Sequence, residues 1–360
     1  MENNKVFRNW LDNFQLPHPL VIAGPCSAET EEQVLKVAHQ LKDTDTTVFR
    51  AGIWKPRTRP GNFEGVGAIG LKWLQRAKEE TGLLLATEVA NRNHVELALE
   101  AAIDVLWIGA RSTVSPFIVQ EIADALRGTD KIVLVKNPVN PDLPLWLGAV
   151  ERLYDANIEK LGVIHRGFST YEKTTYRNNP EWQLAVDLQQ KFPDLPLILD
   201  PSHIGGKRDL IFDLCQTGLD LNYDGIMVET HFDPDNAWSD AAQQITPERL
   251  KQITVDLKIR QETNEETKFQ SDLQVLRTKI DILDNQLMDM LNKRMQIAEE
   301  IGELKKANNV AILQTDRWNN VLQKMVRLGE EKNLSKEFIL KLLKAVHQES
   351  IQHQHRIISK

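Results

Sequence analysis

The sequence predicts an α/β barrel of eight strands followed by an all-helical segment. Eight short apolar stretches, rich in β-branched residues, recur before residue 231, and no strand pattern returns after them. Near-continuous apolar strands are typical of a parallel sheet that is covered on both faces, and eight β/α units of this combined length fit a (β/α)8 TIM barrel. An open, doubly wound sheet is the alternative architecture.

The eight predicted strands are Leu20–Cys26, Thr46–Ala51, Leu83–Glu88, Val105–Arg111, Lys131–Lys136, Glu159–His165, Leu195–Asp200 and Gly225–Thr230. Helical periodicity follows most of them, as at Glu31–Leu41, Gly67–Glu80, Asn91–Ala102 and Pro116–Arg127. This regular alternation of strand and helix is what a βα-repeated architecture requires.

The composition is that of an ordinary globular protein. The chain has 360 residues and a net charge of −7, so it has no basic surface of the kind that nucleic acids or acidic membranes attract. No apolar run approaches the roughly 18 residues of a membrane span, and the N-terminus lacks a signal-peptide core, so we expect a cytoplasmic protein. Two cysteines make no disulfide framework. Cys26 therefore remains available as a thiolate ligand, whereas Cys215 reads as core packing.

The composition changes once along the chain. Residues 1–255 form the predicted barrel domain, the polar stretch Asp256–Asp272 a connector, and residues 273–360 a helical domain. In this last domain apolar residues recur at three- and four-residue steps from Leu273 to Leu304, and two further helices are predicted at about Asp316–Gly329 and Ser335–Ile358. Three helices make a small core, so we expect this domain to pair with a second copy, giving a homodimer or a higher homo-oligomer.

Four residues of metal-ligand type close, or closely follow, predicted strands: Cys26, His203, Glu229 and Asp240, with Asp233 and Asp235 as nearby alternatives to the last. Ligands this far apart in sequence meet only if many strand ends converge, as they do at the C-terminal rim of a barrel. A mixed thiolate, imidazole and carboxylate set predicts a divalent metal ion but does not select among Mn, Fe, Co and Zn.

Cations gather at the same predicted rim: Arg50, Lys55, Arg111, Lys136 and Arg166. Like charges on adjacent strand ends repel one another unless an anion with several charges lies among them. Arginine offers a planar fork for phosphate or carboxylate, and lysine a point charge. The array predicts a site for small phosphorylated and carboxylated molecules beside the metal.

The helical domain has polar residues where its apolar seam should continue. Arg294 follows Met290 on the seam, Lys305 lies eleven residues further on, and Arg317 occupies the second helix. In the third helix the seam leads into Ser350 and Gln354. Because buried cations are costly unless they are paired and this seam supplies no acid, we expect an anionic ligand inside the bundle.

The barrel resembles the metal-dependent 3-deoxy-D-arabino-heptulosonate 7-phosphate (DAHP) synthases, in the branch that is similar to the 3-deoxy-octulosonate 8-phosphate synthases. The matching motifs are Ala23-Gly-Pro-Cys-Ser-Ala-Glu29, Lys55-Pro-Arg-Thr58, Ile108-Gly-Ala-Arg111, Asp200-Pro-Ser-His203 and Met227-Val-Glu-Thr-His231. The resemblance implies that Cys26, His203, Glu229 and Asp240 bind the metal. It further implies that Arg50, Lys55, Arg111, Lys136 and Arg166 hold phosphoenolpyruvate, and that Arg57 and Thr58 hold the phosphate of erythrose 4-phosphate. Arg59 departs from the small hydroxyl residue common at its position.

The helical domain resembles the all-helical chorismate mutases over about residues 272 to 357. The match lies in Leu276-Arg277, Ile280-Asp281, Leu291-Asn-Lys-Arg294, Ile301-Gly-Glu-Leu-Lys305 and Asp316-Arg317. It implies that chorismate is held by Arg277, Arg294, Lys305, Gln314, Arg317, Ser350 and Gln354, with Lys305 and Gln354 at the ether oxygen. Arg277 and Arg294 are 17 residues apart, roughly 25 Å along one helix, so Arg277 is expected to serve a second protomer. Gln314 stands where an Asp is frequent, and Trp318 where a Glu is frequent.

Rival readings remain for each domain. The helical domain could be a dimerisation or sensor module without turnover, and the barrel a class I aldolase with Lys136 as its Schiff base, or a binding barrel without catalysis. The predicted barrel starts after about 17 residues, which leaves the helical domain as the candidate sensor for feedback by chorismate or prephenate.

Overall fold

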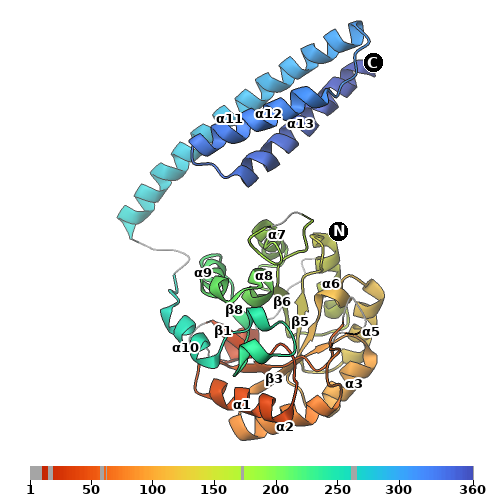
Figure 1. The fold of residues 1–360 in the computed structure, drawn as a ribbon, viewed down its shortest axis with the longest axis vertical. Coiled ribbons are helices and arrows are strands. Elements are labelled where there is room, and N and C mark those ends of the chain that lie inside the picture. Colours follow the sequence, from red (N-terminus) through yellow and green to blue (C-terminus); the bar gives the residue numbers. More distant parts are fainter. Residues whose placement is uncertain are drawn as a thin grey trace. The chain divides into compact units, whose positions relative to one another are not determined.

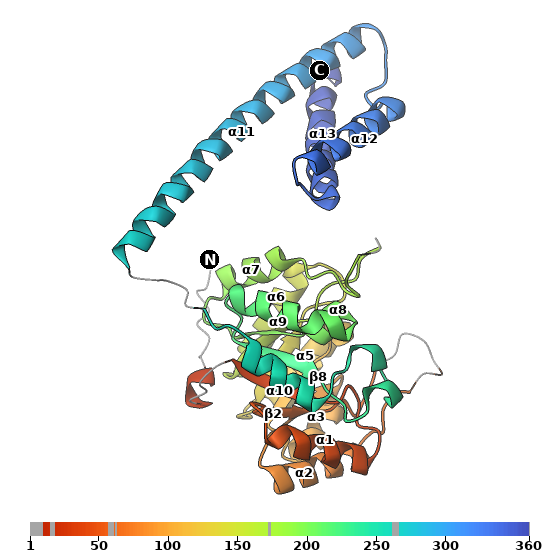
Figure 2. The same ribbon diagram turned by 60° about the vertical axis from the view of Figure 1, so that its left-hand side comes forward.

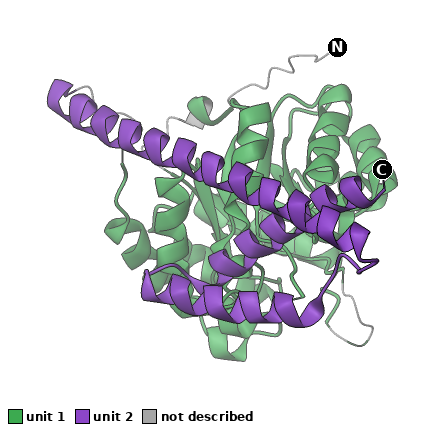
Figure 3. Ribbon diagram, turned by 90° about the horizontal axis from the view of Figure 1, so that it is seen from above, with its two compact units in different colours: residues 1–262 green, residues 263–360 purple. Residues whose placement is uncertain are grey.

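The protein consists of two compact units, residues 1–262 and 263–360, coloured separately in Figure 3. The structure is a computed structural model that describes residues 10–14, 19–56, 61, 63–171, 174–260 and 266–359.

The first unit is a closed barrel of eight parallel strands in chain order (Figure 1). The strands are β1 (Leu20–Gly24), β2 (Val48–Arg50), β3 (Leu84–Val89), β4 (Val105–Ile108), β5 (Ile132–Lys136), β6 (Leu161–His165), β7 (Leu197–Leu199) and β8 (Gly225–Glu229). Gly24 pairs with Glu229, so the first and last strands close the ring. The predicted barrel is confirmed, and the open sheet is excluded because the ring closes.

Helices cover the outside of the barrel (Figure 2). They are α1 (Glu31–Lys42), α2 (Ile69–Thr81), α3 (Arg92–Glu100), α5 (Pro116–Leu126), α6 (Leu143–Asp155), α7 (Trp182–Lys191), α9 (Ile211–Asp220) and α10 (Pro247–Asp256). Shorter helices follow strand ends or loops: η1 (Trp10–Phe14), α4 (Ala110–Thr113), α8 (Pro201–Gly205), η2 (Arg208–Leu210), η3 (Pro234–Asn236) and η4 (Ala241–Gln243).

Side chains along each strand point alternately into and out of the barrel, so the buried residues form two clusters. The cluster that contains Ile22 fills the interior of the barrel, and the cluster that contains Val21 packs between the strands and the helices. Trp10 joins the interior cluster and donates its indole N–H to the carbonyl of Leu161, the first residue of β6. A Cβ at Gly24 would lie 2.0 Å from the backbone oxygen of Arg50, so the close approach of β1 to β2 requires glycine there.

The second unit contains three helices: α11 (Thr267–Ala307), α12 (Thr315–Glu331) and α13 (Lys336–Ile358). Only the C-terminal half of α11 is packed; residues 274–290 are all exposed. Gly302 lets α11 approach α13, because a Cβ there would lie 3.2 Å from the Cα of Gln354. Among the described helices, none is both long and apolar enough to span a membrane.

Candidate active sites

The barrel brings the predicted metal ligands together at the C-terminal ends of its strands. Cys26 follows β1, Glu229 ends β8 and Asp240 precedes η4, and one ligand atom from each lies within 4.8 Å of the others. The Cys26 Sγ is 3.3 Å from Asp240 Oδ2. His203, in α8 after β7, places its Nε2 3.7 Å from Glu229 Oε1. Four side chains that are far apart in sequence thus share one small region.

Neighbouring groups orient these side chains. Asp200 Oδ2 lies 2.8 Å from His203 Nδ1, which directs the other ring nitrogen toward Glu229. Glu229 Oε2 accepts a hydrogen bond from Gln243, whereas its buried Oε1 lies 3.4 Å from Arg50 Nη2 and has no hydrogen-bond partner among the described residues. A carboxylate that orients a ligating histidine, and a buried acceptor without a hydrogen bond, are both typical of a metal site. The donor set therefore fits a divalent cation.

The charge state of the cluster also favours a cation. Burial, followed by the negative charge of Glu229, raises the pKa of the Cys26 thiol to about 12 although Lys55 opposes the shift. Burial alone would raise the pKa of Asp240, but His203 and Arg177 outweigh it and lower that pKa. The carboxylate stays ionised, and a bound divalent ion would supply the positive charge that a Cys26 thiolate needs.

Two buried cations lie beside this cluster. Arg50 ends β2 and Lys136 ends β5, and both approach the ring of Trp107, at 4.9 and 5.8 Å from its centroid. Lys136 Nζ lies 2.8 Å from Asp200 Oδ2. The Nη2 of Arg50 donates to the carbonyl of Cys26, whereas its buried Nε and Nη1 have no partner among the described residues. Unpaired guanidinium donors next to a metal site suit a phosphate or carboxylate.

The other predicted barrel cations lie around the same rim. Lys55 donates to the Cys26 carbonyl and lies 3.3 Å from its sulfur. Arg166 follows β6 and donates to Asn178; burial lowers its pKa to about 10, with Asp200 opposing the shift. Arg111 lies in α4, just beyond β4. Arg57 and Thr58 lie outside the described residues.

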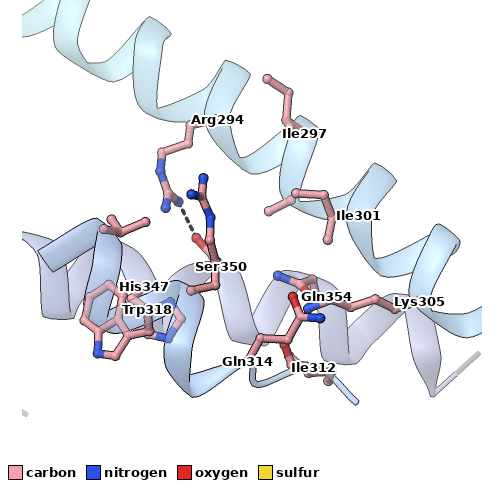
Figure 4. Close-up of a pocket in the computed structure, with 13 residues that line it drawn as sticks. Arg294, Ile297, Ile301, Lys305, Ile312, Gln314, Trp318, His347, Ser350 and Gln354 are labelled. Atoms are coloured by element: carbon pink, nitrogen blue, oxygen red, sulfur yellow. Dashed lines mark hydrogen bonds between the residues drawn. The ribbon is translucent and has the colours of Figure 1, made fainter. Parts of the chain in front are cut away.

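The helical unit holds a pocket of about 320 Å³ between its helices (Figure 4). The lining residues are Arg294, Ile297, Ala298, Ile301, Lys305, Ile312, Gln314, Arg317, Trp318, Val321, His347, Ser350 and Gln354. Arg294 donates to the hydroxyl of Ser350, and Lys305 Nζ lies 3.2 Å from Gln354 Oε1. Six predicted residues therefore line one pocket. The seventh, Arg277, lies in the exposed half of α11 and does not line it.

The pocket is cationic. Among the described lining residues there are three cations and no Asp or Glu. Arg294 and Arg317 are exposed in the single chain and Lys305 is half-buried, so the expectation that these cations are buried is wrong. Their partial burial still lowers the pKa of both Arg294 and Lys305, which means that the empty pocket disfavours their charged forms. An anionic ligand would offset that cost.

Sequence reasoning missed several residues that shape the two sites. Asp200 ends a strand stretch and could have been found by its place at the rim, but Gln243 ends the short helix η4 and Arg177 lies between β6 and α7, and neither carries such a signal. Arg177 donates to Asp240 at 2.9 Å and to Gln243 at 2.6 Å. His347 stacks on the ring of Trp318 with centroids 3.9 Å apart, so the position where a Glu is frequent has become part of an aromatic wall.

Residues 17–268 match the DAHP synthetase I family. The chain belongs to this family. Residues 276–355 match chorismate mutase type II. The protein is therefore a bifunctional enzyme, a transferase and an isomerase, in which a DAHP synthase domain is fused to a helical chorismate mutase domain.

Relatives cover the barrel. A phospho-2-dehydro-3-deoxyheptonate aldolase from Thermotoga maritima is 33% identical over 238 residues, which are 66% of this chain and 68% of the relative. A 2-dehydro-3-deoxyphosphooctonate aldolase from Syntrophotalea carbinolica is 27% identical over 67% of this chain and 90% of its own length. The crystal structure of the Thermotoga enzyme matches with a TM-score of 0.60 at 31% identity, covering 66% of this chain and 67% of that one.

Proposed function

We propose that the barrel condenses phosphoenolpyruvate with erythrose 4-phosphate to give DAHP and phosphate, in a metal-dependent reaction, and that the helical unit rearranges chorismate to prephenate. The observation that carries the barrel proposal is the meeting of Cys26, Glu229 and Asp240 beside the unpaired donors of Arg50. The higher identity to the heptonate enzyme than to the octonate enzyme favours a four-carbon sugar phosphate as the acceptor.

The barrel residues divide the work of binding. Arg50, Lys136 and Arg166 would hold the phosphate and carboxylate of phosphoenolpyruvate, and the buried Asp200 fixes the Lys136 ammonium. Held in this way, the enol carbon C3 of phosphoenolpyruvate is aligned with the aldehyde carbon of the sugar phosphate. Water then adds at C2 and phosphate leaves. A divalent ion held by Cys26, His203, Glu229 and Asp240 would supply Lewis-acid polarisation of the aldehyde oxygen.

The Schiff-base alternative is disfavoured by the surroundings of Lys136. Its Nζ is buried and ion-paired with a carboxylate at 2.8 Å, whereas a Schiff base requires an uncharged amine. The test is turnover of phosphoenolpyruvate and erythrose 4-phosphate with and without chelator. Loss of turnover with chelator and its return with added metal are expected. Chelator-resistant turnover together with trapping by borohydride would contradict the proposal.

The helical pocket suits a dicarboxylate. Arg294 and Arg317 would bind the two carboxylates of chorismate in its compact reactive conformer, while Lys305 and Gln354 would meet the ether oxygen where charge builds. Loss of chorismate absorbance on incubation with the protein tests this. A pocket that binds chorismate without consuming it would favour the sensor alternative.

We place Arg277 in the pocket of a second copy. Residues 274–290 of α11 are all exposed, and they carry a run of large apolar side chains: Val275, Leu276, Ile280, Ile282, Leu283, Leu287, Met288 and Met290. Apolar surface of this extent is typical of a protein interface. A dimer through this half of α11 would cover it and carry Arg277 to the partner's pocket.

Prephenate or chorismate bound at Arg294 and Lys305 is proposed to inhibit the synthase, because these compounds lie downstream of the barrel's product. Such coupling is typically about 1–3 kcal/mol, or roughly 5- to 150-fold in affinity. The test compares prephenate inhibition of the synthase in the whole chain, in Arg294→Ala and in a chain ending near Gln261. Equal sensitivity in all three, or none in the whole chain, would contradict the coupling.

A further inference from the structure

His165, the last residue of β6, is fully buried behind the barrel site, between the strands and α7. Its Nε2 lies 2.6 Å from the carbonyl oxygen of Pro180, and its Nδ1 lies 2.6 Å from the hydroxyl of Tyr223. A carbonyl can only accept a hydrogen bond, so the ring proton resides on Nε2. Nδ1 therefore accepts from the Tyr223 hydroxyl. Both ring nitrogens are satisfied in one neutral tautomer.

The surroundings hold the ring in that state. The rings of Trp146, Phe168 and Trp182 lie 5.5–6.1 Å from the imidazole, centroid to centroid. Burial lowers the pKa of His165 to about 4, and the bond to Pro180 opposes the shift only in part. The imidazole is consequently uncharged at neutral pH and rigidly oriented.

The two bonds matter because of the segment between His165 and Pro180. The described parts of this segment, residues 166–171 and 174–180, lie between the end of β6 and the start of α7. Phe168 and Asn179 exchange two backbone hydrogen bonds of 2.8 Å at its base. Arg166 donates to Asn178 across the same base, and Asn178 donates to the carbonyl of His203 at 2.6 Å. Near its return end, Arg177 binds Asp240.

We propose that His165 is a positioning residue for the synthase reaction, a neutral clamp that ties the return end of segment 166–180 to the start of that segment and to Tyr223. The clamp keeps Arg166 aimed at phosphoenolpyruvate and keeps Arg177 and Asn178 against Asp240 and His203. It rests on the proposed function in one respect, the role of Arg166 in binding phosphoenolpyruvate. His165 moves no proton in the reaction.

Substitution by glutamine tests the clamp sharply. A glutamine side chain offers an amide N–H donor and an oxygen acceptor, the two functions of the neutral tautomer, but it cannot be protonated. We expect His165→Gln to keep the Michaelis constant for phosphoenolpyruvate within about threefold and His165→Leu to raise it about tenfold or more, because a displaced cation binds its anion poorly. Tyr223→Phe removes only the hydroxyl, keeps the ring and should fall between the two.

The melting temperature and the hydrogen exchange of residues 166–180 are measured for the same variants. Cys215→Ala is the matched control, a buried change in α9 that should lower the melting temperature without altering the Michaelis constant. Hydrogen exchange of residues 166–180 should accelerate in His165→Leu and stay unchanged in His165→Gln. If His165→Leu and Tyr223→Phe lower only the melting temperature, with unaltered hydrogen exchange and Michaelis constant, the clamp is refuted. If His165→Gln loses as much turnover as His165→Leu, with unaltered hydrogen exchange, His165 instead transfers a proton.

One further outcome separates the clamp from the proposed function. Accelerated exchange in His165→Leu with an unchanged Michaelis constant for phosphoenolpyruvate would support the clamp and contradict the role of Arg166. The same measurements on the whole metal-loaded enzyme give both answers.

Discussion

The barrel site and the helical pocket both gather cations, but the barrel pairs some of its cations with acids and the pocket does not. In the barrel, Lys136 faces Asp200 at 2.8 Å and Arg50 faces Glu229 at 3.4 Å. The described residues that line the pocket include no Asp or Glu, and Arg294 donates there to the hydroxyl of Ser350. A paired site is organised before its ligand arrives, whereas an unpaired one is stabilised by the ligand.

The two sites also differ in whether a single chain supplies all of their residues. The barrel gathers Cys26, Glu229 and Asp240, with His203 beside Glu229, from the strand ends of a single closed ring and the segments that follow them. The helical unit leaves residues 274–290 uncovered and Arg277 away from the pocket. We therefore regard the barrel site as complete in one protomer and the pocket as completed by a second.

Cys26→Ala should produce the largest effect and strike only one site. If the proposed metal site is right, losing one ligand from a set of four should lower synthase turnover by roughly 10³-fold or more, because the ion would supply the Lewis acid. Chorismate turnover in the same preparation should be unchanged. Synthase assays at saturating metal provide the measurement, and full activity there would show that Cys26 is only a packing residue.

Arg294→Ala should lower chorismate turnover by two to three orders of magnitude, roughly the effect of removing a main electrostatic contact. Within the described part of the chain, no Asp or Glu lines the pocket, so the Arg294 guanidinium has no carboxylate partner there when the pocket is empty. We therefore expect the melting temperature of Arg294→Ala to stay the same or rise. Lys293→Ala, a change at the exposed neighbouring lysine, is the control for both measurements. A marked fall in melting temperature with mutase activity retained would favour a structural role for Arg294.

Lowering the pH should reduce the stabilisation of the fold that comes from the Asp200 carboxylate in the barrel site. Burial alone would raise the pKa of Asp200, but His203 and Lys136 hold it well below the ordinary value. A carboxyl with a lowered folded-state pKa stabilises the fold above its unfolded pKa of about 3.9, and this contribution is lost as the pH falls through the folded value. Asp200→Asn should thus be less stable than the parent at pH 7.

The difference in the free energy of unfolding between Asp200→Asn and the parent should shrink below about pH 4. In that range the unfolded parent begins to bind a proton at Asp200 that the folded parent does not bind, which lowers the parent's stability. Urea unfolding at pH 7 and at pH 3.5 measures this difference, with Asp194→Asn at an exposed position as the control. A gap that stays constant with pH would mean that Asp200 acts through packing or helix capping alone.

The sequence predicts the regular elements, and it also predicts the site residues that lie at the ends of those elements. The eight strands and the three C-terminal helices follow from apolar spacing, and the candidate ligands follow from the strands because side chains at strand ends must meet at one rim. Strand limits were predicted too long, as in Val105–Arg111, where β4 ends at Ile108 and Arg111 already lies in α4. Glycine and polar residues after a strand turn the chain, which apolar spacing does not reveal.

The sequence does not predict site residues whose contacts depend on how separate elements pack together. Arg177 and Gln243 contact Asp240 and Glu229 only because the segments after β6 and β8 fold over the rim, and no local pattern indicates that. The partnership of His165 with Tyr223 joins residues 58 positions apart. Such contacts depend on packing between elements, whereas the sequence pattern reports mainly each element by itself.

Subunit mixing tests the central contrast most directly. Arg277→Ala and Arg294→Ala should each be nearly inactive as mutases, but a mixed dimer would hold one intact pocket, with Arg294 from one chain and Arg277 from the other. After exchange of equal amounts, about a quarter of the parent's mutase activity should return, as random pairing in a twofold dimer requires. Cys26→Ala mixed with Arg50→Ala should regain no synthase activity, because both residues belong to one barrel. Absence of mutase recovery despite demonstrated subunit exchange, or recovery of the synthase, would contradict the account.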